Sequence, residues 1–214
     1  MKSRLFSRTA IGMTAVLLGF AASVKAGPPL ICHPIDIGQA KSLPLVDWNQ
    51  KGNGEYDVKN LTRDTLAILT QGTPVLVRME TLRRATLFAR HDPQVAKELL
   101  TRLHLRAVGS DAAGHPDGLA WFDFGYLAET YKQWMGKDDP NPARTLDGYS
   151  YVKKAISLSA SDPEMEFAAA LITLEGPASD HEAHLRKALA GSGSDPLLAR
   201  NLASRFKGQM LSAL

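Results

Sequence analysis

The chain has 214 residues, of which 44% are hydrophobic and 22% are charged, which suits one compact domain with a substantial core. Its 25 basic residues outnumber its 22 acidic ones, but four of the basic residues and none of the acidic ones lie in residues 1–26. The remaining 188 residues carry 21 basic and 22 acidic side chains, so the charge gives no support for binding to nucleic acid or to an acidic membrane.

Residues 1–26 have the three zones of a secretory signal. The positive zone carries Lys2, Arg4 and Arg8, and the apolar zone, residues 10–22, is shorter than the about 20 residues that a membrane span needs. Residues 24–26 offer a cleavage site with Gly27 as the new N-terminus. The alternative is an uncleaved membrane anchor. We therefore expect a protein exported to the periplasm or outside a Gram-negative bacterium, with no stable membrane insertion after cleavage.

Residues 27–60 are rich in proline and glycine, which predicts an extended, irregular arm. Eight apolar side chains are too many for a free tail: Leu30, Ile31, Ile35, Ile37, Leu43, Leu45, Val46 and Trp48. We expect the arm to pack along a helical body and to cover one of its faces.

The arm holds the one cysteine of the chain, Cys32, so an intramolecular disulfide is excluded. Cys32, His33 and Asp36 supply a thiolate, an imidazole and a carboxylate, which are all metal ligands. No further ligand is near in the sequence. The alternatives are a metal- or cofactor-binding site that uses Cys32 and His33, and a partly buried cysteine beside a histidine that hydrogen-bonds within the arm. The prediction for the whole chain is that it holds no cofactor.

After Asn60 the apolar residues recur with the period of a helix, which predicts an all-α body over residues 61–214 with about seven to eight helices. We expect these helices near residues 61–72, 73–90, 93–108, 118–135, 147–159, 163–174, 180–190 and from 196 onward. In the second helix Glu80 precedes Arg84 by four residues, which favours an ion pair on a solvated face. The alternative for this run, residues 78–84, is a basic recognition surface.

A basic pair, an alanine and Asp-Pro occur in this order three times, with the proline always eight residues after the alanine. The three alanines are Ala85, Ala155 and Ala188, and the three Asp-Pro pairs begin at Asp92, Asp162 and Asp195. Aspartate followed by proline predicts an N-cap with proline in the first helical turn. The last two copies lie 33 residues apart, which is the length of one helix-turn-helix repeat and favours stacked helical hairpins.

Trp121, Phe124, Gly125 and Ala128 fit the first-helix pattern of tetratricopeptide repeats, with Phe124 in place of leucine and Ala128 in place of tyrosine. Residues 118–214 therefore resemble that superfamily in a degenerate form. The resemblance implies a right-handed superhelix of paired helices whose concave face binds peptides or protein segments. A glycine at position 125 also allows two helices to approach closely.

Two further groups of side chains are candidates for a site. Phe122, Tyr126 and Trp134 lie off the apolar stripe of their helix, so they are predicted to line a ligand groove or to meet the arm. His181 and His184 are three residues apart, whereas the metalloprotease pattern needs four, so we favour a solvated helix start with Asp180 as its N-cap.

The sequence thus predicts an exported all-α scaffold of stacked hairpins that binds an unidentified protein or peptide and has no catalytic activity. A metal- or cofactor-binding protein that uses Cys32 and His33 is the alternative, and a hydrolase with a site between the arm and the aromatic helix is a third possibility.

Overall fold

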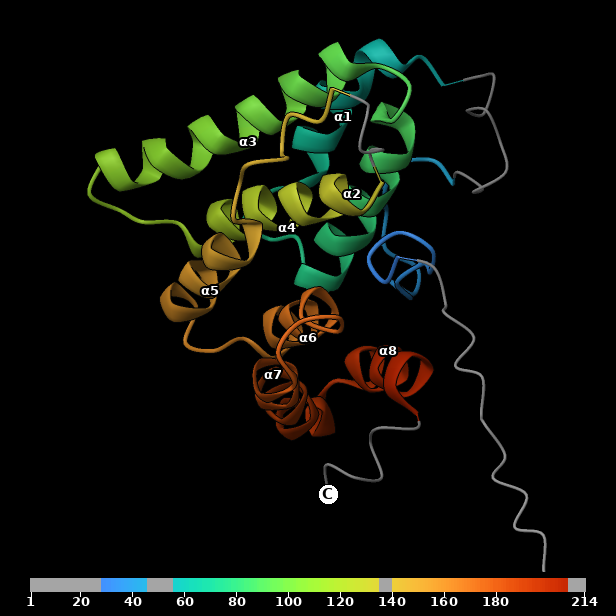
Figure 1. Cartoon of the computed structure of the whole chain (residues 1–214), viewed down its shortest axis with the longest axis vertical. Coiled ribbons are helices and arrows are strands. Elements are labelled where there is room, and N and C mark those ends of the chain that lie inside the picture. The colour runs from blue at the N-terminus through green and yellow to red at the C-terminus, as the bar shows by residue number, and fades with distance from the viewer. Residues whose placement is uncertain (1–27, 46–55, 135–139, 208–214) are drawn as a thin grey trace, which may run out of the picture.

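The computed structural model describes residues 28–45, 56–134 and 140–207, so the predicted signal in residues 1–26 lies outside the described residues. The described part of the chain is all-helical, as predicted, and contains no strand (Figure 1). Its elements are η1 (Val58–Asn60), α1 (Leu61–Ile68), α2 (Val75–Ala89), α3 (Pro93–Ala112), α4 (Gly118–Trp134), α5 (Gly148–Leu158), α6 (Pro163–Ile172), α7 (Ala178–Gly191), η2 (Ser192–Ser194) and α8 (Pro196–Phe206). None of these helices combines the length and the apolar character that a membrane span requires.

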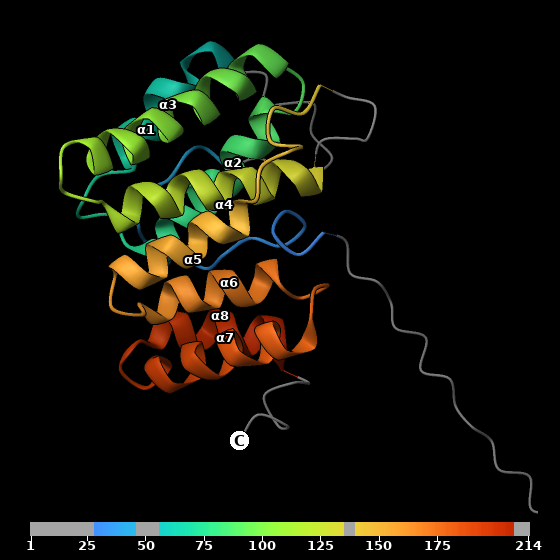
Figure 2. The ribbon, with the colours of Figure 1, turned by 60° about the vertical axis from the view of Figure 1, so that its left-hand side comes forward.

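The helices pack in two layers. The most extensive pairings join α4 to α5 and α6 to α7, and both pairs are hairpins of consecutive helices. The even-numbered helices also contact one another, because α2 packs against α4 and α6, and α8 packs against α6. Figure 1 shows α5 toward the left of the molecule and α2 and α8 toward the right, and Figure 2 shows α5, α6 and α7 stacked one below another. We call α2, α4, α6 and α8 the arm-facing layer, because residues 28–45 run across it.

The three Asp-Pro pairs begin helices α3, α6 and α8, which confirms the predicted caps. In each case the aspartate side chain accepts hydrogen bonds from two main-chain N–H groups of the first turn, and the proline occupies a position whose N–H would have no helical partner. The alanines of the same phrase, Ala85, Ala155 and Ala188, are fully buried in α2, α5 and α7. The recurring phrase therefore marks a buried helix contact followed by the start of another helix.

Two helix ends differ clearly from the prediction, since α3 continues to Ala112 where an end near residue 108 was expected, and α1 ends early. α1 ends at Ile68, four residues before Gly72, because Thr73 and Arg78 supply hydrogen-bond partners to the loop that follows. The Thr73 hydroxyl donates to the Ile68 carbonyl at 2.5 Å, and Arg78 donates to the carbonyls of Thr70 and Thr73. A loop whose carbonyls are satisfied in this way needs no glycine to end the helix.

Arg78 also forms an ion pair at the centre of the molecule. Its guanidinium lies 2.6 Å from the Asp123 carboxylate of α4, and both side chains are fully buried. Removing either partner would leave an uncompensated charge in the core, so this pair fixes α2 against α4.

Two glycines bring α4 and α5 into close contact, as predicted for Gly125. A Cβ atom on Gly125 would lie 2.7 Å from the Gly148 carbonyl oxygen and 2.9 Å from the Val152 nitrogen. A Cβ atom on Gly148 would lie 2.5 Å from the Gly125 carbonyl oxygen. All three distances are to main-chain atoms, which cannot move aside without shifting a helix.

We expect Gly125→Ala to lower the free energy of unfolding by about 1–3 kcal/mol, the usual effect of overpacking a core. Gly109→Ala is the matched control, because Gly109 lies in α3 with open space around its Cα, and alanine there favours the helix by up to about 1 kcal/mol. Urea denaturation of both variants measures the difference. Equal stabilities would contradict the close contact.

Glu164 links three helix starts. Its carboxylate accepts a hydrogen bond at 3.0 Å from the Leu76 N–H in the first turn of α2, although Glu164 itself belongs to α6. Burial, a hydrogen bond with the Asp195 carboxyl group and the charge of Asp162 raise the pKa of Glu164 to about 7, and the bond from Leu76 opposes this rise. Two carboxyl groups that share a hydrogen bond hold one proton between them, so protonated Glu164 suits the fold.

This raised pKa makes a testable prediction about pH. Because the pKa of Glu164 is higher in the folded protein than in the unfolded chain, its contribution to stability is complete below about pH 4 and is lost as the pH rises through about 7. We expect Glu164→Gln to raise the free energy of unfolding at pH 8 by on the order of 1 kcal/mol and to change it little at pH 4. Thermal denaturation at both pH values tests this, with Glu182→Gln on the exposed side of α7 as the control.

Candidate functional site

Residues 28–45 cross the arm-facing layer without forming a helix or a strand (Figures 1 and 2). Their buried aliphatic side chains are Leu30, Ile31, Ile35, Ile37 and Leu43, whereas Leu45 is 72% exposed. Val46 and Trp48, which we expected to pack as well, lie outside the described residues. The arm therefore covers the face of the body that would otherwise be open, and this face is the candidate functional site.

Glu80 of α2 is the central anchor of the arm. Its side chain is fully buried and accepts four hydrogen bonds. Arg83 donates two of them, from Nε at 2.7 Å and from Nη2 at 2.9 Å, and Arg84 Nε donates a third at 2.7 Å. The fourth comes from the main-chain N–H of Ile35 in the arm, at 2.9 Å. Four bonds match the number of lone-pair sites on a carboxylate, so Glu80 is saturated only when the arm is in place.

Each of the two arginines also donates one hydrogen bond to a carbonyl of the arm. Arg83 Nη1 donates to the Ile31 carbonyl at 3.1 Å, and Arg84 Nη1 donates to the Leu43 carbonyl at 2.5 Å. We predicted an ion pair between Glu80 and Arg84, which is confirmed, and a solvated face, which is wrong. The face is dry because the arm lies over it, and its charged groups recognise the main chain of the arm.

Helices α8 and α4 hold other main-chain groups of the arm. Asn201 of α8 binds both main-chain groups of Asp36. Its Oδ1 accepts from the Asp36 N–H at 2.9 Å, and its Nδ2 donates to the Asp36 carbonyl at 2.8 Å. Arg205 of α8 donates to the His33 carbonyl at 2.6 Å. Gln133 of α4 accepts from the Leu30 N–H at 2.8 Å.

Side chains of the body thus hold seven main-chain groups of the arm: the N–H groups of Leu30, Ile35 and Asp36 and the carbonyls of Ile31, His33, Asp36 and Leu43. Every peptide carries such groups, so these contacts can hold an extended segment of almost any sequence. The buried aliphatic side chains add preference for particular residues. Main-chain bonds that give affinity, combined with pockets for some side chains, are the usual chemistry of extended-peptide recognition.

Nothing in the local sequence pattern pointed to Arg205 or Gln133, and Asn201 was not identified from the sequence either. One signal existed: Asn201 lies between Leu198 and Leu202 on the apolar side of α8 and is almost fully buried. A lone amide on an apolar helix face needs partners in the core, and here the partners come from residue 36.

The aromatic residues that we expected at a groove lie in different surroundings. Phe122 and Tyr126 are fully buried, with ring centroids 5.5 Å apart, because α4 is covered by α2, α3, α5 and α6. They line no open groove in this structure. Trp134 is half-buried at the end of α4, where the Arg90 guanidinium lies 5.0 Å from its ring centroid.

The three candidate metal ligands of the arm, Cys32, His33 and Asp36, have different surroundings. Cys32 is a half-buried free thiol whose pKa is raised by burial, and His33 is exposed with a pKa that burial and the charges of Arg205 and Arg83 lower. The Asp36 carboxylate accepts from the Gly38 N–H and pairs with Arg200, each at 2.9 Å. In the described part of the chain, no three histidine, cysteine, aspartate or glutamate side chains are grouped so that they could hold a metal ion.

The histidines of α7 are buried, so the predicted solvated helix start is wrong. His184 Nδ1 lies 2.5 Å from the buried Glu166 carboxylate of α6, and its Nε2 lies 2.8 Å from the Tyr149 hydroxyl of α5. His181 Nδ1 lies 2.9 Å from the Ala170 carbonyl. The two histidines face α6 because they are three residues apart on one side of α7.

The row Glu166, His184 and Tyr149 has the order of a catalytic relay, but its electrostatics favour a structural role. Burial and the charges of Asp180 and Glu166 raise the pKa of Tyr149 to about 12, so its hydroxyl keeps its proton at neutral pH. A nucleophile would need the opposite shift. The row therefore ties α5, α6 and α7 together.

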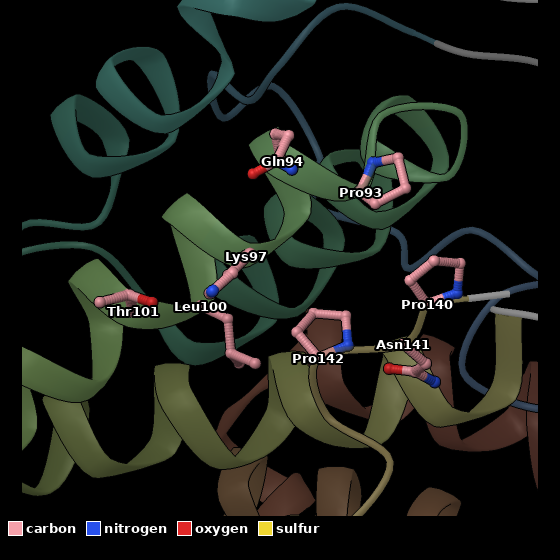
Figure 3. Close-up of a pocket in the computed structure, with 8 residues that line it drawn as sticks. All are labelled: Pro93, Gln94, Lys97, Leu100, Thr101, Pro140, Asn141 and Pro142. Atoms are coloured by element: carbon pink, nitrogen blue, oxygen red, sulfur yellow. The ribbon is translucent and has the colours of Figure 1, made fainter.

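Two cavities lie beside helices of the body, one next to α3 and one next to α8. One, of about 450 Å³, lies between α3 and the segment Pro140–Pro142, and Figure 3 shows side chains from both. Its lining is Pro93, Gln94, Lys97, Leu100, Thr101, Pro140, Asn141 and Pro142, and it does not touch the arm. The other, of about 240 Å³, lies where the arm meets α8 and the end of α6.

Comparisons of the chain with protein-family models, with curated proteins and with solved structures gave no match.

We expect Glu80→Gln to detach the arm. Burial opposes ionisation of Glu80, but Arg83, Arg84 and the Ile35 N–H hold its pKa below the usual range, so its contribution to stability is present above about pH 4.5 and is lost as the pH falls through the lowered value. The substitution leaves two arginines without their charge partner and should lower the free energy of unfolding by about 3 kcal/mol at pH 7.

Two measurements check this prediction. Urea denaturation at pH 7 and pH 3 should show that the loss of stability on acidification is smaller in Glu80→Gln than in the wild type. Limited proteolysis should cut residues 28–45 faster in the variant. Glu98→Gln, on the exposed side of α3, is the control and should match the wild type in both assays. An arm that stays equally protected in Glu80→Gln would refute the anchoring role.

Proposed function

We propose that this protein is an exported scaffold, periplasmic or extracellular, that mediates protein interaction by binding an extended peptide segment on its arm-facing layer. The observation that carries the proposal is the set of seven main-chain groups held by side chains of α2, α4 and α8. The signal-like residues 1–26 support the location.

We also propose that the helices form a degenerate tetratricopeptide-like stack. The hairpins α4–α5 and α6–α7, the Asp-Pro starts of α6 and α8, and the spacing of 33 residues between Ala155 and Ala188 support this arrangement. In that superfamily paired helices present one face to a peptide, and the arm occupies the corresponding layer here.

The arm is then the resident segment, which a partner segment replaces. Its covalent attachment to the body keeps its local concentration high, on the order of millimolar by the general rule for linked binding segments. A partner segment must therefore bind the face better than the arm does, or be present in excess.

The proposal is tested with the whole chain. A protease recognition sequence replaces residues 51–54 in a Cys32→Ser background, the protein is folded and then cut, and the arm becomes an exchangeable peptide. A fluorescent synthetic peptide of residues 28–45 is added, and its anisotropy is followed to equilibrium. We expect saturable binding with a dissociation constant in the micromolar range or below, and slower tumbling only with the cut protein.

The main chain is tested by N-methylation of the peptide. A methyl group on the Ile35 nitrogen removes the donor to Glu80 and should weaken binding by about 10- to 100-fold, the effect of a lost hydrogen bond to a charged group. A methyl group on the Lys41 nitrogen is the matched control and should change binding less than threefold, since Lys41 is exposed. No uptake of the unmodified peptide, or equal binding of both methylated peptides, would overturn the proposal.

A further inference from the structure

The arm leaves a cavity unfilled on the face that it covers. This cavity, of about 240 Å³, is bounded by the arm residues Pro29 and His33 and by the body. Its apolar wall consists of Leu171, Leu174 and Phe206, and its polar rim consists of Glu175, Ser204 and Arg205. The cavity is wide enough to admit water, and the transfer of apolar surface from water into a protein contact is favourable, so a larger apolar group in the cavity would bind favourably.

His33 of the arm is one of the residues that line this cavity. Its main chain is fixed, because Arg205 donates to its carbonyl at 2.6 Å, and this bond does not depend on the side chain. The residue as a whole remains exposed, and burial together with the charges of Arg205 and Arg83 lowers the pKa of the imidazole. At this register the arm therefore carries a polar, exposed residue beside a cavity with apolar lining residues.

We infer that the partner segment of this face carries a large apolar side chain at the register of His33, between aliphatic side chains at the registers of Ile31 and Ile35, and that this side chain fills the cavity that the arm leaves open. The inference rests on the proposed function and names its ligand class: an extended, aliphatic segment of another exported chain with phenylalanine, tyrosine, tryptophan or leucine at that register. The polar side chains of the rim can form a hydrogen bond with the hydroxyl of tyrosine or with the indole N–H of tryptophan.

This difference explains how a partner can replace a tethered arm. A segment that matched the arm at every register would have no advantage over it, because the arm has the higher local concentration. A segment that makes the same main-chain bonds and also fills the cavity binds more tightly at one position only. The arm then holds the face closed against segments that lack the large apolar residue.

The test uses the cut protein and synthetic peptides of residues 28–45. We expect the peptide with His33→Phe to bind about tenfold more tightly than the unmodified peptide, since burying one large apolar side chain has an effect of that order. The peptide with Gln39→Phe is the matched control, because Gln39 is exposed and the same residue there should change binding less than twofold. Equal gains at both positions would show general adhesion of an aromatic ring and would overturn the inference.

A variant of the body locates the effect. Leu174 is half-exposed at the end of α6, so Leu174→Ala removes part of the cavity wall with little effect on the fold. In this variant the gain from His33→Phe, measured against the unmodified peptide on the same Leu174→Ala protein, should fall below threefold. A gain that is unchanged in Leu174→Ala would place the phenyl ring outside the cavity and would overturn the inference.

The uncut chain gives an independent readout. His33→Phe in the full chain should raise the midpoint of thermal denaturation by several degrees, whereas Gln39→Phe should not. If the unmodified peptide fails to bind the cut protein, the proposed function fails. If it binds and His33→Phe gives no gain in affinity or in the denaturation midpoint, only this inference fails.

Discussion

A buried carboxylate is costly unless hydrogen-bond donors surround it, and this requirement on Glu80 organises one side of the molecule. Arg83 and Arg84, on the same helix, supply three of the four hydrogen bonds, and the arm supplies the last. The two arginines in turn need acceptors, which are the carbonyls of Ile31 and Leu43. The helix and the arm thus complete each other, and neither is a satisfied structure alone.

The other elements place these groups at the right distance from α8. The fully buried pair Arg78 and Asp123 fixes α2 to α4, and α6 lies between that pair of helices and α8. Asn201 can then bind both main-chain groups of Asp36, although 165 residues separate them in the sequence. The packing of helices away from the arm therefore determines whether Glu80 of α2 and Asn201 of α8 can bind the arm at the same time.

Local features of the fold were predictable from the sequence, because their partners are near in the chain. The starts of α3, α6 and α8 follow from Asp-Pro, and the close contact of α4 with α5 follows from Gly125. The candidate site was less predictable, since its bonds join distant segments. Glu80 and Arg84 have the spacing of a surface ion pair, and only the arm, about 45 residues earlier, makes their environment dry. His184 has the pattern of a solvated helix start for the same reason, because its partners Glu166 and Tyr149 belong to other helices.

Because the body recognises the main chain of the arm, the side chains on the outer side of the arm have no role in docking. Gly38, with a φ of +59°, turns the chain, and Gln39, Ala40 and Lys41 that follow it are exposed. Substitutions there change the charge and shape of the molecular surface while the anchors beneath stay as they are. The arm therefore separates an inner side that must be conserved for docking from an outer side that can diversify, so two proteins with this fold could present different surfaces over the same buried contacts.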